Sequence, residues 1–395
     1  MSTSSTQHGG GLLSPTRIGR VNRARVLELL HQEGPSSRAQ LARALGVNRA
    51  TIASILQPLI DSGTLVEGDQ VSASPAGGKP ARPLWFNRDG NELGSMRLAP
   101  RSVTAARLGM DGTVHHQTNR GFNPEEGLDV VTAALTAAAE ECFSDRTVLG
   151  IGIASSGMVD TTTGTILAIN LAPVLNGFPL GAVMAERFEV PVAVDHHPRV
   201  QALGDKWFGQ GRAVPSFASV YTGEALGMGI VHERQIVRGP AGAGGEYGHM
   251  VVDMNGDPCT CGRRGCWETV ASLPWLRRQA VERGLAGAGE IDCGHLAHAA
   301  DQGDAEAAEL LDLYARNLAI GMANNEHMIA SGTYIVHGDA ARGGDRMRES
   351  LDRWLGGLAP RRGSTTAVLL GSSGDESTLL GGGGLVLSTV LGGNV

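Results

Sequence analysis

The sequence lacks the features of a membrane or exported protein. It contains no run of 18 or more apolar residues, which argues against a transmembrane helix. Its N-terminus, MSTSSTQHGGGLLSPTR, has no apolar core segment and so does not read as a secretory signal. We therefore expect residues 1–16 to be a disordered tail, the protein to be cytoplasmic, and no membrane to be among its partners.

Cysteine is also scarce, with five residues in a chain of 395. Cys259, Cys261 and Cys266 fall within eight residues, whereas Cys142 and Cys293 stand apart. Clustered cysteines in a cytosolic chain favour metal binding over disulfides. The sequence shows no fixed-period repeat of about 20–50 residues, which argues against a solenoid. The length allows two or three domains with a sizeable core.

Basic residues are unevenly distributed. Residues 1–90 carry 10 Lys or Arg and 6 Asp or Glu, a net charge of +4, and the remainder carries 23 and 34, a net charge of −11. A basic head on an acidic body suggests that the head meets a polyanion, although chance variation over 90 residues is the alternative.

The head has the pattern of a helix-turn-helix. RIGRVNRARVLELLHQEG places apolar residues at helical spacing and stops at Gly34-Pro35. Ser36 or Ser37 can cap the next helix, which Gly46 ends, and VNRATIASILQPLIDSG follows as a third helix. Two short helices joined by a tight turn predict DNA binding through the third helix.

A wing follows the third helix. Two short β-type runs flank the loop SASPAGGKPARP, which is rich in Gly, Pro and Ser and carries two basic residues. We predict residues 17–88 to be a winged helix-turn-helix; a trihelical packing or dimerisation module is the alternative. The candidate DNA contacts are Ser37, Arg38, Asn48, Arg49, Ala50, Thr51, Lys79 and Arg82.

From residue 89 onward, β-type and helical segments alternate, which indicates an α/β body. Its most specific stretch is GGEYGHMVVDMNGDPCTCGRRGCWE. His249, Cys259, Cys261 and Cys266 supply one imidazole and three thiols, the ligand set of a closed tetrahedral zinc site. We therefore expect one structural Zn²⁺; unrelated buried cysteines are the alternative.

The head, the E-x-G-H segment ending at His249 and the segment CTCGRRGCWE together resemble the ROK family of repressors, open reading frames and sugar kinases. The resemblance extends from about Arg17 to the end of the chain. It implies a two-lobed, actin-like and hexokinase-like ATPase fold with a structural zinc and a sugar cleft, covering residues 89–395. We place the small lobe at about 89–197 and the large lobe at about 198–395. The added head resembles the repressor branch, which includes regulators of xylose and N-acetylglucosamine genes.

The resemblance also implies the sugar contacts. The loop ASSGMVD matches the family's sugar-binding glycine loop, Glu246 and Glu268 match the two glutamates that bind sugar hydroxyls, and the family histidine that both ligates zinc and touches the sugar is His249. Carboxylates and imidazoles are good partners for a polyol. A loop-ordering role for Glu246 and a surface charge at Glu268 are the alternatives. The candidate effector contacts are Ser156, Gly157, His196, His197, Glu246, His249 and Glu268.

The chain departs from the family kinases at the catalytic positions. PVAVDHH carries His197 where the kinases have the catalytic Asp, and Arg97 and Pro100 fall near the kinases' Asp-x-Gly-x-Thr phosphate loop. Proline offers no N–H to a phosphate, and bulky side chains prevent its close approach. Glu224 and His337-Gly338 replace small residues at two further family positions. We therefore expect no ATP binding and assign no catalytic residue.

Three roles for His196 and His197 stay open. We argue against joint metal binding because adjacent strand residues point to opposite faces. The remaining possibilities are a sugar contact, a contact to an anionic group such as a sugar phosphate, or a collapsed cleft with no ligand.

These expectations combine into one leading hypothesis, a sugar-responsive transcriptional regulator of the repressor type that acts as a homodimer or a dimer of dimers on double-stranded DNA. An ATP-dependent sugar kinase with an accessory head and a scaffold that binds a protein are the alternatives.

Overall fold

The computed structural model describes residues 15–69, 82–88, 91–144, 147–360 and 366–391. The described residues divide into two compact units. One unit, the head, holds the residues up to Asn87 together with those from Leu387 onward, and the other, the body, holds residues 88–386. The last described residues thus group with the head, whereas we had expected the effector domain to run to residue 395.

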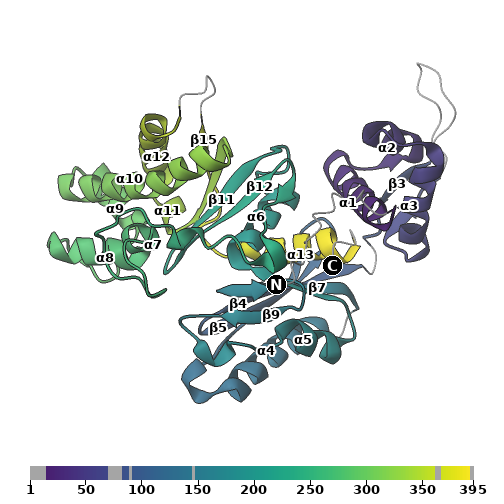
Figure 1. Cartoon of the computed structure of the whole chain (residues 1–395), viewed down its shortest axis with the longest axis horizontal. Coiled ribbons are helices and arrows are strands. Elements are labelled where there is room, and N and C mark those ends of the chain that lie inside the picture. Colours follow the sequence, from purple (N-terminus) through teal and green to yellow (C-terminus); the bar gives the residue numbers. More distant parts are fainter. Residues whose placement is uncertain (1–14, 70–81, 89–90, 145–146, 361–365, 392–395) are drawn as a thin grey trace, which may run out of the picture. The chain divides into compact units, whose positions relative to one another are not determined.

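The head is a three-helix unit with a small sheet (Figure 1). Its first helix begins at Pro15, inside the segment expected to be a tail; residues 1–14 lie outside the described residues. The elements are α1 (Pro15–Glu33), β1 (Ser36–Ser37), α2 (Arg38–Leu45), α3 (Arg49–Asp61), β2 (Leu65–Glu67) and β3 (Pro83–Phe86). The strands form an antiparallel sheet in the order β1-β3-β2.

Local capping explains why the two central helices begin and end where they do. Ser37 and Gln40 form a reciprocal capping box at the start of α2. Gly46 adopts φ 65° at its end, a left-handed conformation that glycine adopts without strain. The Asn48 side chain then accepts a hydrogen bond from the Thr51 N–H and caps α3. The apolar faces of the helices form a common core with Leu27, Leu30, Leu41, Ile52, Ile55, Leu56, Leu59 and Leu84.

The body contains two five-stranded sheets of the same topology. The first has the order β10-β7-β4-β5-β6, and the second has the corresponding order β15-β14-β11-β12-β13. In each sheet, two strands are parallel to the central strand on one side and an antiparallel pair lies on the other. The body is therefore an internal structural duplication, although its sequence shows no repeat.

The first lobe surrounds the sheet of β4 (Glu92–Ala99), β5 (Ser102–Gly109), β6 (Val114–Gly121), β7 (Val148–Ser155) and β10 (Val192–His196). Its apolar core joins this sheet to α4, α5 and the small hairpin of β8 and β9. Those elements are α4 (Leu128–Phe143), α5 (Leu180–Phe188), β8 (Met158–Asp160), β9 (Thr165–Ala168) and the 3-10 helices Pro124–Glu126 and Pro173–Leu175.

The second lobe surrounds the sheet of β11 (Phe217–Thr222), β12 (Leu226–His232), β13 (Gln235–Ile236), β14 (Thr333–Gly338) and β15 (Ala367–Leu370). The long helix α10 and its neighbours pack on this sheet and supply a second core (Figure 1). These are α7 (Glu268–Ala271), α8 (Leu273–Glu282), α9 (Cys293–Asp301), α10 (Ala305–Met328), α11 (Asp339–Arg342), α12 (Gly344–Leu358) and the 3-10 helices Pro240–Gly242 and Tyr247–His249.

Two helices each follow a strand of one lobe in the sequence and pack on the sheet of the other lobe. Helix α6 (His197–Trp207) follows the last strand of the first lobe and packs on β11 and β12 of the second. Helix α13 (Glu376–Leu385) follows the last strand of the second lobe and packs on β4 and β7 of the first. The chain thus passes from the first lobe to the second near residue 197, and α13, which we had placed in the large lobe, packs on strands of the small one. A last helical segment, Val386–Leu391, continues from α13.

Across the part of the chain that the structure describes, no helix combines the length and apolar character needed to span a membrane.

Candidate functional site

A cavity of about 200 Å³ opens between the two lobes of the body. All seven effector contacts expected from the sequence line it. They come from the β7–β8 loop, the end of β10, the start of α6, the loop around Tyr247–His249 and the start of α7. The cavity is smaller than the roughly 300–1,000 Å³ of pockets for drug-sized ligands, and so suits a single small ring.

One end of the cavity carries two carboxylates. Glu268 Oε1 lies 3.5 Å from His249 Nδ1 and 3.0 Å from the Cys259 Sγ, and Glu246 Oε1 lies 3.4 Å from His196 Nδ1. All of these side chains are less than one-third exposed. Such a set presents several acceptors and imidazole nitrogens at short range, which suits the hydroxyl groups of a polyol.

His196 and His197 enter the same cavity. Strand β10 ends at His196 and α6 begins at His197, so the alternation of a strand does not continue through the pair. The prediction that the two side chains point to opposite faces was therefore wrong. Their nitrogens nevertheless have different neighbours, because His197 Nε2 lies 3.1 Å from the Thr378 hydroxyl on α13. Among the residues that the structure describes, neither imidazole belongs to a group of side chains that could hold a metal ion.

Both imidazoles are neutral at pH 7. Burial lowers the pKa of His196, which is partly offset by the charge of Glu246. Burial, reinforced by the positive charge of Arg97, lowers the pKa of His197 well below its ordinary value. Each ring thus keeps one N–H donor and one acceptor nitrogen. Among the described residues, His196 Nδ1 is buried with no hydrogen-bond partner, and so is available to a ligand.

A buried ion-pair network holds the cavity wall. The Asp195 carboxylate, 1% exposed, receives Arg199 Nε at 2.6 Å and Arg238 Nε at 2.8 Å, and Arg199 also donates to the Gly244 carbonyl. Burial alone would raise the pKa of Asp195, but the two guanidinium groups outweigh it and lower that pKa. The network ties β10 to the loop that carries Glu246. Sequence inspection missed it, since a short strand followed by an Arg gives no sign of its distant partners.

The lining of the cavity also contains Arg97, from β4, and Tyr221, from β11. Arg97 Nη1 lies 3.1 Å from Asp375 Oδ2, and the Arg97 side chain is 14% exposed. The Tyr221 ring meets the His197 ring edge-on at 4.6 Å. The sequence had marked Arg97 only as a lost kinase residue, and Tyr221 and Thr378 were not singled out because nothing local distinguishes them.

Next to the cavity is a second pocket, lined by residues at the carboxyl ends of β11 and β14. Glu224 forms an ion pair with Arg277 there, 2.9 Å between Oε1 and Nη1. His337, which the resemblance places at a family glycine, is 1% exposed and lies 2.9 Å from the Asp205 carboxylate. Its ring packs against Gly371, where a Cβ would lie 2.1 Å from it.

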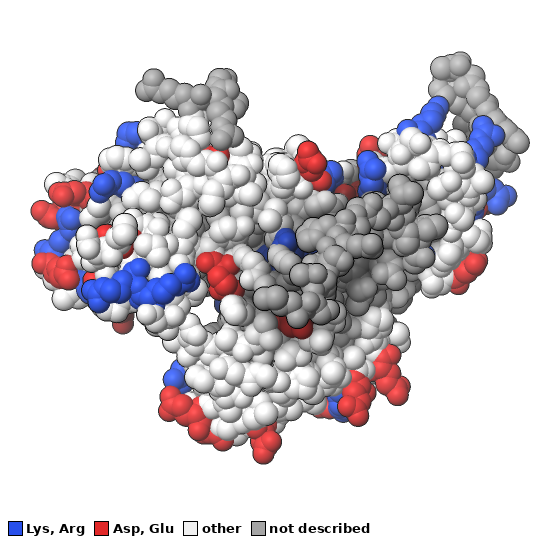
Figure 2. Space-filling model, viewed as in Figure 1, with Lys and Arg blue, Asp and Glu red and all other residues white. Residues whose placement is uncertain are grey.

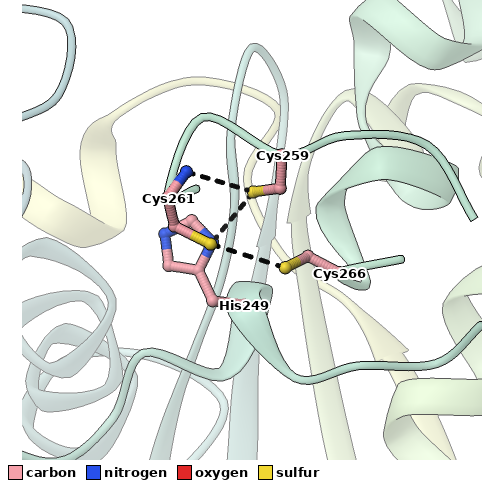
Figure 3. Close-up of side chains that lie close together, drawn as sticks. All are labelled: His249, Cys259, Cys261 and Cys266. Atoms are coloured by element: carbon pink, nitrogen blue, oxygen red, sulfur yellow. Dashed lines mark hydrogen bonds between the residues drawn. The ribbon is translucent and has the colours of Figure 1, made fainter. Parts of the chain in front are cut away.

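The candidate metal ligands meet in one cluster (Figure 3). His249, Cys259, Cys261 and Cys266 each offer one ligand atom, and these atoms all lie within 4.8 Å of one another. Cys259 Sγ is 3.4 Å from His249 Nδ1, and Cys261 Sγ is 3.6 Å from Cys266 Sγ. A tetrahedron with bonds of about 2.0–2.3 Å places its ligands about 3.3–3.8 Å apart, so the residues fit such an ion.

The loop around this cluster is shaped by short bridges and one obligatory glycine. Val251 pairs with Cys266, and Pro258 pairs with Arg264. Gly265 has φ 67°, and a Cβ there would lie 1.5 Å from the Asp253 carbonyl oxygen, so only glycine fits. Burial raises the pKa of Cys261, but hydrogen bonds from Arg263 and the neighbouring thiols outweigh it and lower it to about 6. This thiol therefore reaches the thiolate form near neutral pH.

The expected DNA contacts divide into exposed and internal groups. Arg49 and Ala50 are exposed in the first turn of α3, Thr51 is half-buried beside them, and Arg82 is exposed before β3. Ser37 is 7% exposed in its cap, and Arg38 forms an ion pair with Glu67 at 2.9 Å. Asn48 is exposed and caps α3; Lys79 lies outside the described residues. Basic side chains lie at several places on the head, whereas acidic groups gather on the lobe of α4 and α5 (Figure 2).

Comparison with known proteins covers nearly the whole chain. The ROK family profile matches residues 102–388, and a winged helix-turn-helix DNA-binding profile matches residues 22–66. A putative xylose repressor of Caldicellulosiruptor sp. is 29% identical over 353 residues, which are 85% of this chain and 87% of that protein. The structure of a ROK family transcriptional regulator, a homologue of the E. coli MLC protein, aligns with TM-score 0.80 and 27% identity over 95% of this chain and 97% of that one.

A protein named as a kinase matches a smaller share of the chain. The structure of a ROK family glucokinase from Streptomyces griseus, in complex with glucose and AMPPNP, aligns with TM-score 0.64 and 27% identity. It covers 74% of this chain and 98% of the kinase, so about a quarter of this chain has no counterpart in the kinase.

Proposed function

The chain belongs to the ROK family, and from that premise we propose that it is a repressor-type transcription regulator whose body senses a sugar or sugar phosphate. The observation that carries the proposal is the combination of a winged helix-turn-helix with a cavity lined by Glu246, His249 and Glu268. A regulator needs both a DNA-reading surface and a ligand site that biases its conformation.

On the DNA side, α3 acts as the recognition helix. Its first turn exposes Arg49 and Ala50, and Thr51 lies beside them, so short polar groups and a guanidinium reach base edges and phosphates together. Arg82 and Lys79 belong to the wing and contact the backbone or the minor groove. Ser37 and Arg38 contribute by fixing the start of α2, because their side chains are engaged within the head.

The protein binds its operator as a homodimer or a dimer of dimers. A two-fold symmetric protein recognises a palindrome whose half-sites lie about 34 Å or a multiple of that distance apart. Ligand binding between the lobes changes their separation and, through it, the fraction of molecules with heads placed for both half-sites.

In the body, the ligand's hydroxyl groups bind Glu246, Glu268 and the two buried histidines, with the Ser156–Gly157 loop closing one side. Zn²⁺ held by His249 and the three cysteines would fix the loop that leads into Glu268. The ion would be structural, since four protein ligands leave no open position for water.

The body does not act as a kinase in this proposal. Phosphoryl transfer needs groups that position the phosphates and a base at the attacking hydroxyl. Arg97 and Pro100 stand at the phosphate loop, His337 fills the space of a glycine, and the imidazole of His197 replaces the carboxylate. The kinase alternative predicts ADP release above background in a coupled assay over a panel of hexoses, and our proposal predicts none.

The first test is selection of binding sites from fragmented genomic DNA by the purified full-length protein, with and without a panel of sugars and sugar phosphates. We expect enrichment of a palindrome whose occupancy changes with one compound. Arg49→Ala should weaken the enrichment, whereas Arg353→Ala, at an exposed arginine of the body, should leave it intact. DNA binding without sequence preference would overturn the regulator, and a palindrome indifferent to every compound would overturn the sugar sensor.

A further inference from the structure

Two groups of side chains that line the cavity differ in charge. The group next to the metal cluster contains the carboxylates of Glu246 and Glu268. The other group contains a guanidinium, Arg97, with the neutral ring of His197 and the phenol of Tyr221. A neutral sugar needs only the first kind of contact, so the second kind calls for an explanation.

Arg97 is only partly satisfied where it stands. Its side chain is 14% exposed, its one ion pair among the described residues joins Nη1 to Asp375, and a side-chain hydrogen bond links it to Tyr221. Its Nε is buried, and the described part of the chain offers this atom no hydrogen-bond partner. A buried guanidinium with an unused donor is costly unless a ligand supplies an acceptor. The planar fork of Arg matches a phosphate or carboxylate through two parallel N–H donors.

The other side chains that line the cavity around Arg97 are compatible with a bound anion. Burial lowers the pKa of His197 and raises that of Tyr221, so both are uncharged at pH 7 and each retains a polar hydrogen. Glu224 also lines the cavity, but its carboxylate is neutralised by Arg277. Asp375, at 38% exposure, is the only carboxylate paired with Arg97 among the described residues, and it is the group that an incoming anion must replace.

Asp375 is placed to leave without a large penalty. It stands at the start of α13, where its side chain makes no capping hydrogen bond. A carboxylate released there stays near the positive end of the helix dipole and in contact with water. Thr378, one turn further along the same helix, forms a hydrogen bond with His197. Both Asp375, which would be displaced, and Thr378, which contacts His197, therefore lie at the start of α13.

We propose that Arg97 is the anchor of an anion subsite in the cleft, and that the effector is a monosaccharide phosphate whose phosphate monoester displaces Asp375 from Arg97. The proposal rests on the proposed function and makes it more specific. The hydroxyl groups of the same molecule face Glu246 and Glu268, and its phosphate faces Arg97. Loss of the Arg97–Asp375 pair frees the start of α13, a helix that packs on both α6 and the first sheet.

The experiment is calorimetric titration of the full-length, metal-loaded protein with matched pairs of probes. The pairs are glucose and glucose 6-phosphate, N-acetylglucosamine and its 6-phosphate, and xylose and xylose 5-phosphate, with glucuronate and inorganic phosphate alone as further probes. For at least one pair, we expect the phosphate to bind tenfold or more tightly than the free sugar. Inorganic phosphate alone should bind far more weakly, because it lacks the hydroxyl contacts.

Two substitutions then act in opposite directions. Arg97→Gln should remove the preference for the phosphate and leave the affinity for the free sugar within about twofold. Asp375→Asn should raise the affinity for the phosphate severalfold, because the internal competitor has lost its charge. Arg101→Gln, at an exposed arginine just beyond β4 that pairs with Glu125, is the matched control and should change neither affinity. If Arg97→Gln does not fold, Asp375→Asn and Arg97→Lys carry the test.

The failures are distinguishable. Equal binding of both members of every pair that binds, or an unchanged ratio in Arg97→Gln, overturns the anion subsite while leaving the sugar sensor standing. Tighter binding of glucuronate than of any phosphate overturns the assignment to a phosphate. If no probe binds while sequence-specific DNA binding is intact, the sugar sensor falls and the subsite falls with it.

Discussion

Replacing Gly204 with alanine should destabilise the body, although alanine is the better helix former. Gly204 lies on α6, where that helix crosses α13. A Cβ at this position would lie 1.9 Å from the Ser377 carbonyl oxygen and 3.0 Å from the Gly381 nitrogen. The carbonyl would have to withdraw by about 1 Å to reach 3.0 Å, below which real Cβ atoms essentially never approach. Because the obstacle is backbone, it cannot rotate away.

The magnitude follows from two opposing terms. Gly to Ala in a helix interior gains about 1 kcal/mol of helix propensity. An extra methyl group in a close-packed site costs about 1–3 kcal/mol, and the upper end applies where backbone must move. We therefore expect a net loss of about 1–2 kcal/mol in the free energy of unfolding. At roughly 2–4 °C per kcal/mol for a large domain, the Tm falls by about 2–8 °C.

Gly357→Ala is the matched control. Gly357 lies on α12, and a Cβ there meets nothing within 4 Å, so only the propensity term of about 1 kcal/mol remains. Its Tm should rise by about 2–4 °C under the same conditions. Urea and thermal unfolding followed by circular dichroism measure both variants. Equal or higher stability of Gly204→Ala than of the unsubstituted protein would refute the close packing of α6 against α13.

Three further expectations concern the metal, the head and the cleft. Cys261→Ser, or treatment with a chelator, should release about one zinc ion per chain by elemental analysis and reduce the ligand response before DNA binding, because the cluster holds the loop next to Glu268; an unaltered response would count against that coupling. Arg49→Ala should lower the slope of log Kd for DNA against log salt by about one, as expected for the loss of one phosphate contact, and an unchanged slope would place Arg49 away from the backbone. Stability should fall as the pH drops below about 6.5, because the folded protein holds the pKa of His197 below that of the unfolded chain, which then takes up the proton first. His197→Gln should flatten this dependence in urea melts between pH 5 and 8, and an equally steep decline in that variant would assign it to other groups.

The features that could be predicted from the sequence are those encoded over short distances. The cap at Ser37 and the turn at Gly46 are each decided within a few residues, and both appear in the structure. The Cys₃His cluster is similar, since its three cysteines lie within eight residues and His249 is ten residues from the first. Short-range hydrogen bonds and chain closure determine such sites with little help from the rest of the fold.

The parts that could not be predicted depend on long-range packing. Arg97 and Asp375 are brought together only because α13 returns to the first sheet, and no local pattern reports that exchange of helices. The duplicated topology of the two sheets is invisible for the same reason, since topology can persist when sequence similarity between the halves has disappeared. His197 illustrates the limit most clearly. Strand β10 ends at His196 and α6 begins at His197, so the strand alternation used to predict the direction of the His197 side chain does not apply.

The residues at positions 97 and 197, which the family resemblance assigns to kinase catalysis, can be explained together. A kinase keeps carboxylates where the acceptor hydroxyl and the metal-bound phosphates meet, because it must stabilise a transition state rather than retain a product. This chain has an imidazole at residue 197 and a guanidinium at residue 97, positions that the family resemblance assigns to kinase carboxylates. Our proposal therefore implies that the cleft favours a bound phosphate ester over the transfer that would make it. A sensor of the proposed kind gains from this, because a ligand that is not consumed sets the occupancy of the cleft by its concentration alone.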